Sequence, residues 1–345
     1  MRLLASLFPI VLLACTRERS SPEIVVTTIA TFGDTAGDGA IAGTPTIARD
    51  QAGRFYAATP FGAADALVAV YDSTGRFLTR LGGIGDGPGE YRQPNVVTPL
   101  GDSMAIFDAG TRRVNVIGPS LEWAGSIPAP GPVMSATGFP DGSFVVNWPL
   151  PSGDSARGFF QLYDRHGRFV RSFEEPRAPC ESEACLWEGS FVYRADSRGG
   201  IWAARMLGEL EISRFDSAGR LVRRLALHAP WFPSHPSRGT FPREMMVGIA
   251  PDAFGHLWLS GFTTDPAAPD TARATRPGDP ERLDGILEVR DSLSGAVIAT
   301  RRFDDAVLLL PLGDGLIAHI GQHDDGWARI EIWRAELKEK GAFSP

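Results

Sequence analysis

The stretch Asp72-Ser-Thr-Gly75-Arg-Phe-Leu78 decides the fold, because close copies of it return along the whole chain. Each copy begins with an aspartate, reaches a glycine three residues later and then enters a β-type apolar segment. The other copies begin at Asp50, Asp164, Asp196, Asp216 and Asp252. An aspartate can accept backbone N–H groups at the start of a turn, and a glycine can take the positive φ that closes it. The repeat therefore predicts antiparallel β-hairpins in repeated units.

Two kinds of predicted hairpin alternate along the chain. The first kind has tight turns near residues 51, 102, 141, 197, 253 and 314, a spacing of about 50 residues. The second kind is longer and covers Val68–Leu81, Val114–Ile127, Phe159–Phe173, Leu210–Leu225 and Ile286–Phe303. Four short strands at this period are typical of a β-propeller. We expect an all-β, six-bladed β-propeller of four-stranded antiparallel blades that forms one domain over residues 23–340. A β-sandwich is the alternative, but it does not require six matching units.

The two ends of the chain fit a closed ring. The last unit has only three predicted strands, whereas Ile24–Phe32 is a lone strand before the first unit. We expect this N-terminal strand to complete the last blade, which would remove the open sheet edges. A short tail over residues 335–341 is the one segment for which a helix is expected.

The composition is that of an ordinary globular protein, with 43% hydrophobic and 22% charged residues among 345. The formal net charge is −7, and lysine and arginine do not cluster. A nucleic-acid partner would need a basic surface, so the sequence argues against one.

The N-terminus has the pattern of an export signal. Arg2 precedes an apolar run, which ends in Leu12-Leu13-Ala14-Cys15 and is short for a membrane span. This end resembles a bacterial lipobox, which implies a signal peptide over residues 1–14, lipidation of Cys15 and a polar tether over residues 15–22. An ordinary secretory signal with a chance cysteine remains the alternative. Because Thr16 rather than aspartate follows the cysteine, we expect the outer membrane.

Cys180 and Cys185 are the other cysteines. In an exported protein, two close cysteines favour a disulfide. Free thiols remain possible, and a zinc site is disfavoured because only two thiolates and no nearby histidine are present.

The string from Leu81 to Pro94, Leu-Gly-Gly-Ile-Gly-Asp-Gly-Pro-Gly-Glu-Tyr-Arg-Gln-Pro, is the most specific one in the chain. Together with Phe107–Val116, it resembles the loops of bacterial six-bladed β-propeller lipoproteins, which are NHL-repeat-like or TolB-like. The resemblance implies the propeller fold and an envelope location. The glycines have a spacing that also occurs in dinucleotide sites, but such a site needs a following helix. Two prolines, Pro88 and Pro94, bracket a loop here, in which we expect Glu90 to cap backbone N–H groups.

Ligand binding is expected on one face of the propeller. We place it on the loops that join consecutive blades and those that join the second and third strands of a blade. Candidate ligand-binding residues on or beside these loops are Arg92, Arg112, Arg113, Trp148, Trp187, Trp231 and His235. Arg194 and Arg205 could add to a positive mouth on the acidic body. The alternative is that the tryptophans cover blade ends and the arginines form salt bridges.

The sequence contains no catalytic constellation, so we name no catalytic residue and no cofactor. The preferred function is a lipid-anchored envelope scaffold, facing the periplasm, that binds a protein, a peptide or a carbohydrate. The alternative is a lactonase-like, metal-dependent hydrolase or lyase with its site at the mouth of the central channel. His323, Asp324 and Asp325 would be its candidate metal ligands, with Ca²⁺ as the metal.

Overall fold

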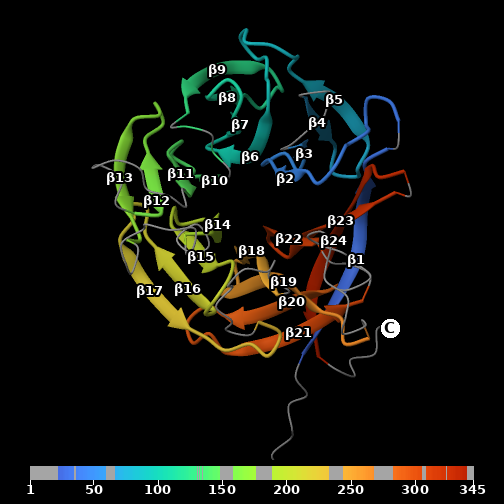
Figure 1. The fold of residues 1–345 in the computed structure, drawn as a ribbon, viewed down its shortest axis with the longest axis vertical. Helices are drawn as coiled ribbons and strands as arrows, with labels where there is room; N and C mark the ends of the chain where they lie inside the picture. Colours follow the sequence, from blue (N-terminus) through green and yellow to red (C-terminus); the bar gives the residue numbers. More distant parts are fainter. Residues whose placement is uncertain are drawn as a thin grey trace, which may run out of the picture.

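A computed structural model describes residues 22–34, 36–59, 67–129, 131, 133, 135–147, 158–175, 189–232, 244–267, 283–304, 308–323 and 325–339. Six antiparallel sheets of four strands each surround a central axis (Figure 1). The predicted all-β, six-bladed propeller is therefore confirmed. Within these ranges no helix is present that is long and apolar enough to cross a membrane.

The first three blades follow the chain in order, four strands to a blade. Their strands are β2 (Thr46–Arg49), β3 (Phe55–Ala58), β4 (Val68–Tyr71), β5 (Phe77–Leu81), β6 (Pro94–Leu100), β7 (Ser103–Asp108), β8 (Arg113–Ile117), β9 (Trp123–Pro128), β10 (Ala136–Gly138), β11 (Phe144–Asn147), β12 (Phe160–Tyr163) and β13 (Phe169–Phe173). In this half of the chain, each tight hairpin predicted from the sequence corresponds to the first and second strands of a blade, and each longer hairpin corresponds to the third and fourth strands.

The other three blades repeat this order, except that the last contains β1 as its fourth strand. Their strands are β14 (Phe191–Ala195), β15 (Ile201–Arg205), β16 (Glu211–Phe215), β17 (Leu221–Ala226), β18 (Met245–Pro251), β19 (His256–Thr264), β20 (Leu283–Asp291), β21 (Val297–Phe303), β22 (Leu308–Gly313), β23 (Leu316–Gln322), β24 (Ala328–Lys338) and β1 (Glu23–Phe32).

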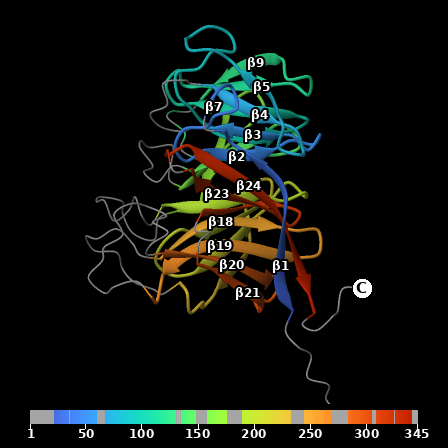
Figure 2. The same cartoon turned by 90° about the vertical axis from the view of Figure 1, so that its right-hand side faces the viewer.

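The N-terminal strand closes the ring as predicted. β1 pairs antiparallel with β24, from Glu23 opposite Lys338 to Phe32 opposite Ile330. Figure 2 shows these two long strands side by side. The expected helical tail over residues 335–341 is wrong as far as Lys338, because β24 continues to that residue. Ala335 and Leu337 pack in the core of the last blade, and their pairing with β1 continues the strand.

The repeated turns have the predicted geometry. In all six, the glycine has a φ between 71° and 91°. The aspartate carboxylate accepts the backbone N–H four residues later at 2.8–3.0 Å. Arginine occupies that later position in four turns and returns to the aspartate as an ion pair, for example Arg54 to Asp50 at 2.6 Å. The phrase Asp-x-x-Gly-Arg is therefore a self-contained turn.

Core side chains lie between neighbouring blades. The middle strands β3, β4, β11 and β12 are buried at every position, whereas the outer strands β9 and β17 are mostly exposed. Tyr56 and Tyr91, for example, are fully buried in one cluster between the first two blades. Each middle strand is therefore apolar on both faces, as in other fully covered sheets.

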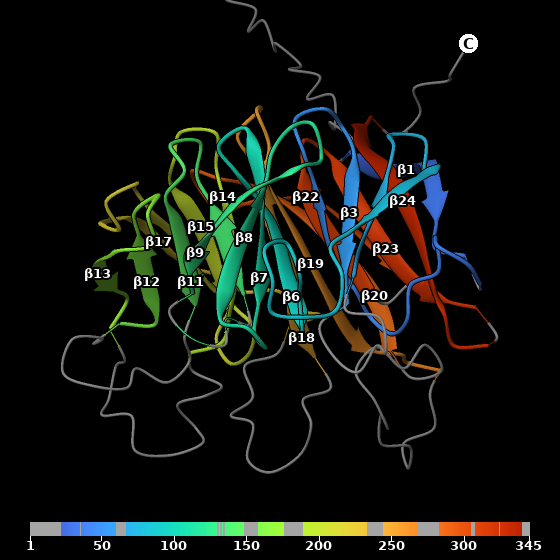
Figure 3. The same ribbon diagram turned by 90° about the horizontal axis from the view of Figure 1, so that it is seen from above.

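The propeller has two different ends (Figure 3). At the end that we call the turn face, the first strand of each blade joins the second and the third joins the fourth. At the opposite end, the loop face, the second strand joins the third and one blade joins the next. β24 continues past Arg334, which lies opposite Leu316 at the start of β23, so β24 ends and β1 begins at the turn face.

Candidate functional site

Several residues proposed from the sequence lie outside the residues that the structure describes. These are Cys15, Trp148, Cys180, Cys185, Trp187, His235 and Asp324. The lipidation, the disulfide and four of the candidate site residues therefore stay predictions.

Arg92 and Arg113 are brought together on the loop face by the glycine-rich loop. The Nε of Arg92 donates to the Asp86 carboxylate at 2.7 Å, and Nη1 of Arg113 donates to the Asp86 carbonyl oxygen at 2.6 Å. The bond from Arg92 holds the pKa of Asp86 below its ordinary value. Glu90 accepts the N–H of Gly87 at 2.7 Å, as expected for a capping residue.

Asp108 fixes the end of the same loop. This carboxylate is 1% exposed and accepts the backbone N–H groups of Arg92, Gln93 and Gly110. Arg112, four residues after Asp108, has a positive φ of 55°. The loop is therefore built to hold its own shape, and its role in ligand binding stays a prediction.

Trp231 and Arg205 are buried. The Trp231 indole packs in the core between the fourth and fifth blades, and its N–H donates to Glu288 at 2.9 Å. Arg205 lies 3.8 Å from Glu174 and 3.6 Å from Glu211, in an ion-pair group between the third and fourth blades. Both side chains contribute to packing in this structure.

The two described members of the candidate metal site make local bonds. Nε2 of His323 donates to the carbonyl oxygen of Gly33 at 2.9 Å, and Asp325 accepts the N–H of Trp327 at 3.4 Å. Over the part of the chain that the structure describes, no three His, Cys, Asp or Glu side chains are grouped as metal ligands.

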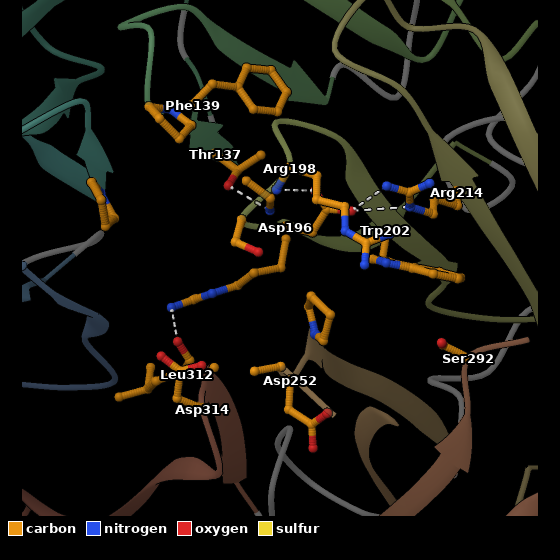
Figure 4. Close-up of a pocket in the computed structure, with 18 of the residues that line it drawn as sticks. Thr137, Phe139, Asp196, Arg198, Trp202, Arg214, Asp252, Ser292, Leu312 and Asp314 are labelled. Atoms are coloured by element: carbon orange, nitrogen blue, oxygen red, sulfur yellow. Dashed lines mark hydrogen bonds and ion pairs between the residues drawn. The ribbon is translucent and has the colours of Figure 1, made fainter. Parts of the chain in front are cut away.

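A cavity of about 640 Å³ lies at the centre of the turn face, where the first strands of all six blades end (Figure 4). Each first strand contributes at least one lining residue, and these include Arg49, Pro99, Thr137, Arg194, Pro251 and Leu312. The cavity also extends between the fourth and fifth blades, along Trp202 and Val222. It is thus the mouth of the central channel, at the end opposite the loops on which ligand binding was expected.

Threonine hydroxyls join neighbouring first strands around this mouth. Thr98 accepts the N–H of Gly138 at 3.3 Å, whereas Thr46 donates to the carbonyl of Asn95 at 3.2 Å at the other end of the first strands, near the loop face. Thr137 accepts the N–H of Ala195 at 3.1 Å. Because the bonds of Thr98 and Thr137 cross from one blade to the next, they connect the part of the cavity wall that the second, third and fourth blades form.

Arg194 reaches across the mouth. Its Nη2 donates to the carbonyl oxygen of Leu312 at 2.8 Å, which links the fourth blade to the sixth (Figure 4). No described carboxylate forms an ion pair with Arg194. Burial without a counter-charge lowers the pKa of this guanidinium to about 10, so it is still charged at neutral pH.

Two of the aspartates at the rim are hydrogen-bonded to neighbouring side chains. Asp196 binds the Nε and Nη2 of Arg214 at 3.0 and 2.8 Å, and both lie together on one wall (Figure 4). Asp252 lies 2.9 Å from Nδ1 of His256. Burial opposes ionisation of Asp252, but the N–H donors of His256 and Trp258 outweigh it and hold the pKa of Asp252 below its ordinary value.

The remaining charges at the mouth are mainly positive. Four arginines, Arg49, Arg194, Arg198 and Arg223, line the cavity and form no ion pair with a described carboxylate, whereas two lining carboxylates, Asp252 and Asp314, have no arginine partner among the described residues. The Nε–H of Arg49 is buried and has no hydrogen-bond acceptor among the described residues. The mouth is therefore a positive site on a protein of net charge −7.

Sequence reasoning named Arg194 as a possible part of a positive mouth but did not find the cavity. Its first-strand lining residues are about 50 residues apart in sequence, and closure of the ring alone brings them together. One signal in the sequence could have indicated the cavity: Arg49 and Arg194 stand near the ends of first strands, where other blades have the uncharged residues Pro99, Pro251 and Leu312.

The fold and the cavity define a class, the six-bladed propellers with a binding-sized hollow at one end of the channel. No family model and no curated protein sequence matches the chain. It is similar in structure to a DUF4221 family member from Bacteroides vulgatus, with a TM-score of 0.63, 10% identity and coverage of 93% of this chain and 100% of that one.

A protein from Bacteroides fragilis, provisionally named as exported, has a TM-score of 0.60 and 9% identity, covering 91% and 95% of the two chains. A protein of unknown function from Bacteroides thetaiotaomicron has a TM-score of 0.51 and 13% identity, covering 91% and 76%. At these identities the similarity shows the fold.

Proposed function

We propose that this protein is a non-catalytic binding propeller that holds a ligand in the channel mouth of its turn face. The observation that carries the proposal is the cavity itself, which all six blades line and in which threonine bonds join the second, third and fourth blades. Its volume of about 640 Å³ is in the range of small-molecule sites. The proposed ligand is an envelope component, namely a glycan, a peptide or a segment of a protein that enters the cavity.

The proposed location is the bacterial outer membrane, facing the periplasm, with Cys15 lipidated. Three observations support it: the lipobox-like sequence, the resemblance of Leu81–Pro94 to NHL-repeat-like and TolB-like lipoproteins, and the provisional name of the Bacteroides fragilis neighbour. Seven residues separate Cys15 from β1, and they can span at most about 25 Å. Because β1 begins at the turn face, the anchor would hold the outer edge of that face within that distance of the membrane.

Fractionation of cells tests the anchor. Wild-type protein is expected in the membrane fraction, and Cys15→Ser is expected in the soluble periplasmic fraction. Equal membrane association of the two proteins would contradict the lipid anchor and leave the binding proposal to its own test.

A paired measurement tests binding against catalysis. The protein is screened against envelope sugars and peptides by thermal shift, and any compound that raises the melting temperature saturably is recovered and weighed by mass spectrometry. Binding predicts that the compound returns unchanged, and that a panel of lactones and esters is not hydrolysed with or without Ca²⁺. Turnover of a bound compound, or of the panel, would replace the binding function by the hydrolase or lyase alternative.

A further inference from the structure

We infer that the channel mouth is an anion-binding site, in which Arg194 holds a carboxylate or phosphate group of the ligand. This inference rests on the proposed binding function and names the chemical class of its ligand. It goes beyond that function because it assigns the recognition to one side chain and one kind of charge.

The position of Arg194 carries the first step. The side chain is half-buried in the wall of the cavity, and its one hydrogen bond to a described residue uses a single N–H, to the carbonyl oxygen of Leu312. A guanidinium has five N–H donors in a planar fork that matches two oxygens of a carboxylate or phosphate. Charge-assisted bonds of this kind are the strong ones.

The absence of a nearby counter-charge carries the second step. A half-buried cation without an ion-pair partner is costly, and burial has already lowered the pKa of Arg194. The neighbouring carboxylate Asp196 is paired with Arg214, and Asp252 is hydrogen-bonded to His256 and Trp258, so neither is an ion-pair partner of Arg194. An anionic ligand would provide the charge that the described part of the chain does not place beside Arg194.

The surrounding charges carry the third step. Arg49 and Arg198 line the same cavity, and Arg49 has a buried Nε–H without an acceptor among the described residues. Asp252 and Asp314 oppose them, since both carboxylates line the same mouth. The balance favours an anion, and Asp314 limits its affinity.

The lateral extension of the cavity indicates where the rest of the ligand lies. Val222 and Leu293 line it and are 52% and 66% exposed. These apolar groups face solvent beside a positive site. An anion with a small apolar part would therefore cover them as its charged group meets Arg194.

Isothermal titration of the full-length protein with inorganic phosphate and with succinate tests the inference. Wild-type protein is expected to bind at least one of the two anions at millimolar concentration or below. Arg194→Gln should weaken binding by about tenfold or more, because it removes a charge-assisted hydrogen-bond pair. Arg194→Lys should bind between the two, because it keeps the charge and loses the fork.

Two further variants make the test specific. Asp314→Asn removes the opposing charge and suits the φ of 51° at this position, so it should tighten anion binding by about threefold. Arg171→Gln makes the same charge change as Arg194→Gln on the exposed outer strand β13, away from the cavity, and should bind like wild type. The better of the two anions identifies the group that the site prefers.

Three results would overturn the inference: wild-type protein that binds neither anion, Arg194→Gln that binds as well as wild type, or Arg171→Gln that weakens binding as much as Arg194→Gln. Circular dichroism checks that each variant is folded. If Arg194→Gln is unfolded, the affinity of Arg194→Lys for the anions is compared with that of wild type instead. Failure here would leave the binding function open to a neutral ligand, whereas turnover in the preceding assay would refute that function itself.

Discussion

The aspartates of the repeated turns act as structural anions. At Asp72, the Thr74 hydroxyl and the N–H groups of Arg76 outweigh the effect of desolvation and hold the pKa well below its usual range. Donors within the turns and loops likewise lower the pKa of Asp86, Asp164, Asp216, Asp252 and Asp291. A carboxyl group that is more acidic in the folded than in the unfolded protein stabilises the fold only while it is ionised.

The sign of this linkage gives a pH prediction. Each carboxylate contributes its stability above the unfolded pKa of about 4 and loses it as the pH falls through the lower folded pKa. Asp216→Asn should therefore be less stable than wild type at pH 7, and the gap should narrow below about pH 4 as the wild-type carboxylate protonates. Urea unfolding at several pH values measures this difference in the free energy of unfolding between the two proteins. A gap that stays constant with pH would show that the charge of Asp216 contributes nothing.

Arg194 has the opposite character, because its charge is poorly accommodated by the ligand-free protein. Arg194→Met should leave the free energy of unfolding unchanged or raise it by up to about 2 kcal/mol, since replacement of a poorly compensated buried charge by an apolar group is often stabilising. Thermal unfolding without added anions provides the measurement. A clear fall in the melting temperature would mean that the bond to Leu312 has a structural role instead.

At the scale of the element, the outer hairpins share one irregularity. In five blades the pairing between the third and fourth strands shifts register next to the turn, as at Val70 and Tyr71 in the first blade. A glycine with positive φ next to such a shift is typical of a bulged hairpin, which adds twist to the strands. In the outer hairpins of the first, third and fourth blades, the turn phrase therefore accompanies both a reversal and an added twist.

Gly75 provides a test of this element, because it also touches the closing strand. Its φ is 91°, and a Cβ there would lie 2.4 Å from the carbonyl oxygen of Thr31 in β1. Gly208 has a similar φ of 82° and open space around it. Gly208→Ala should cost about 1–2 kcal/mol from the backbone alone, and Gly75→Ala about 2–5 kcal/mol because β1 must also move. Equal losses in urea unfolding would exclude a role for this contact.

At the scale of the whole molecule, closure depends on one strand at each end of the chain. Arg301 donates to the carbonyl oxygen of Ile24 at 3.0 Å, so β1 also contacts the fifth blade. Removal of residues 1–32 should lower the melting temperature and promote aggregation relative to removal of residues 1–22, because β24 would become a free edge. Thermal unfolding and size-exclusion chromatography measure both effects. Identical behaviour of the two truncations would show that the ring does not need β1.

The sequence predicted the parts of this molecule that local patterns encode. The turn at Asp72 and the lone strand before the first unit are visible within a few residues, and the period of about 50 residues counts the blades. The cavity is a different kind of feature, since Arg194 and Leu312 are 118 residues apart and meet only when the ring closes. The end of β24 was misjudged because the residue types of Ala335–Lys338 are strong helix formers, whereas pairing with β1 maintains the strand there.

The most direct test of the account is to find which end of the channel contacts the ligand in living cells. A photo-crosslinking amino acid is placed at Arg198, on the rim of the turn-face cavity, or at Arg92 on the loop face, and adducts are identified by mass spectrometry. The account predicts an adduct from position 198 that disappears when Arg194→Gln is added, and none from position 92. Adducts from position 92 alone, unaffected by Arg194→Gln, would contradict it and place the binding site on the loop face.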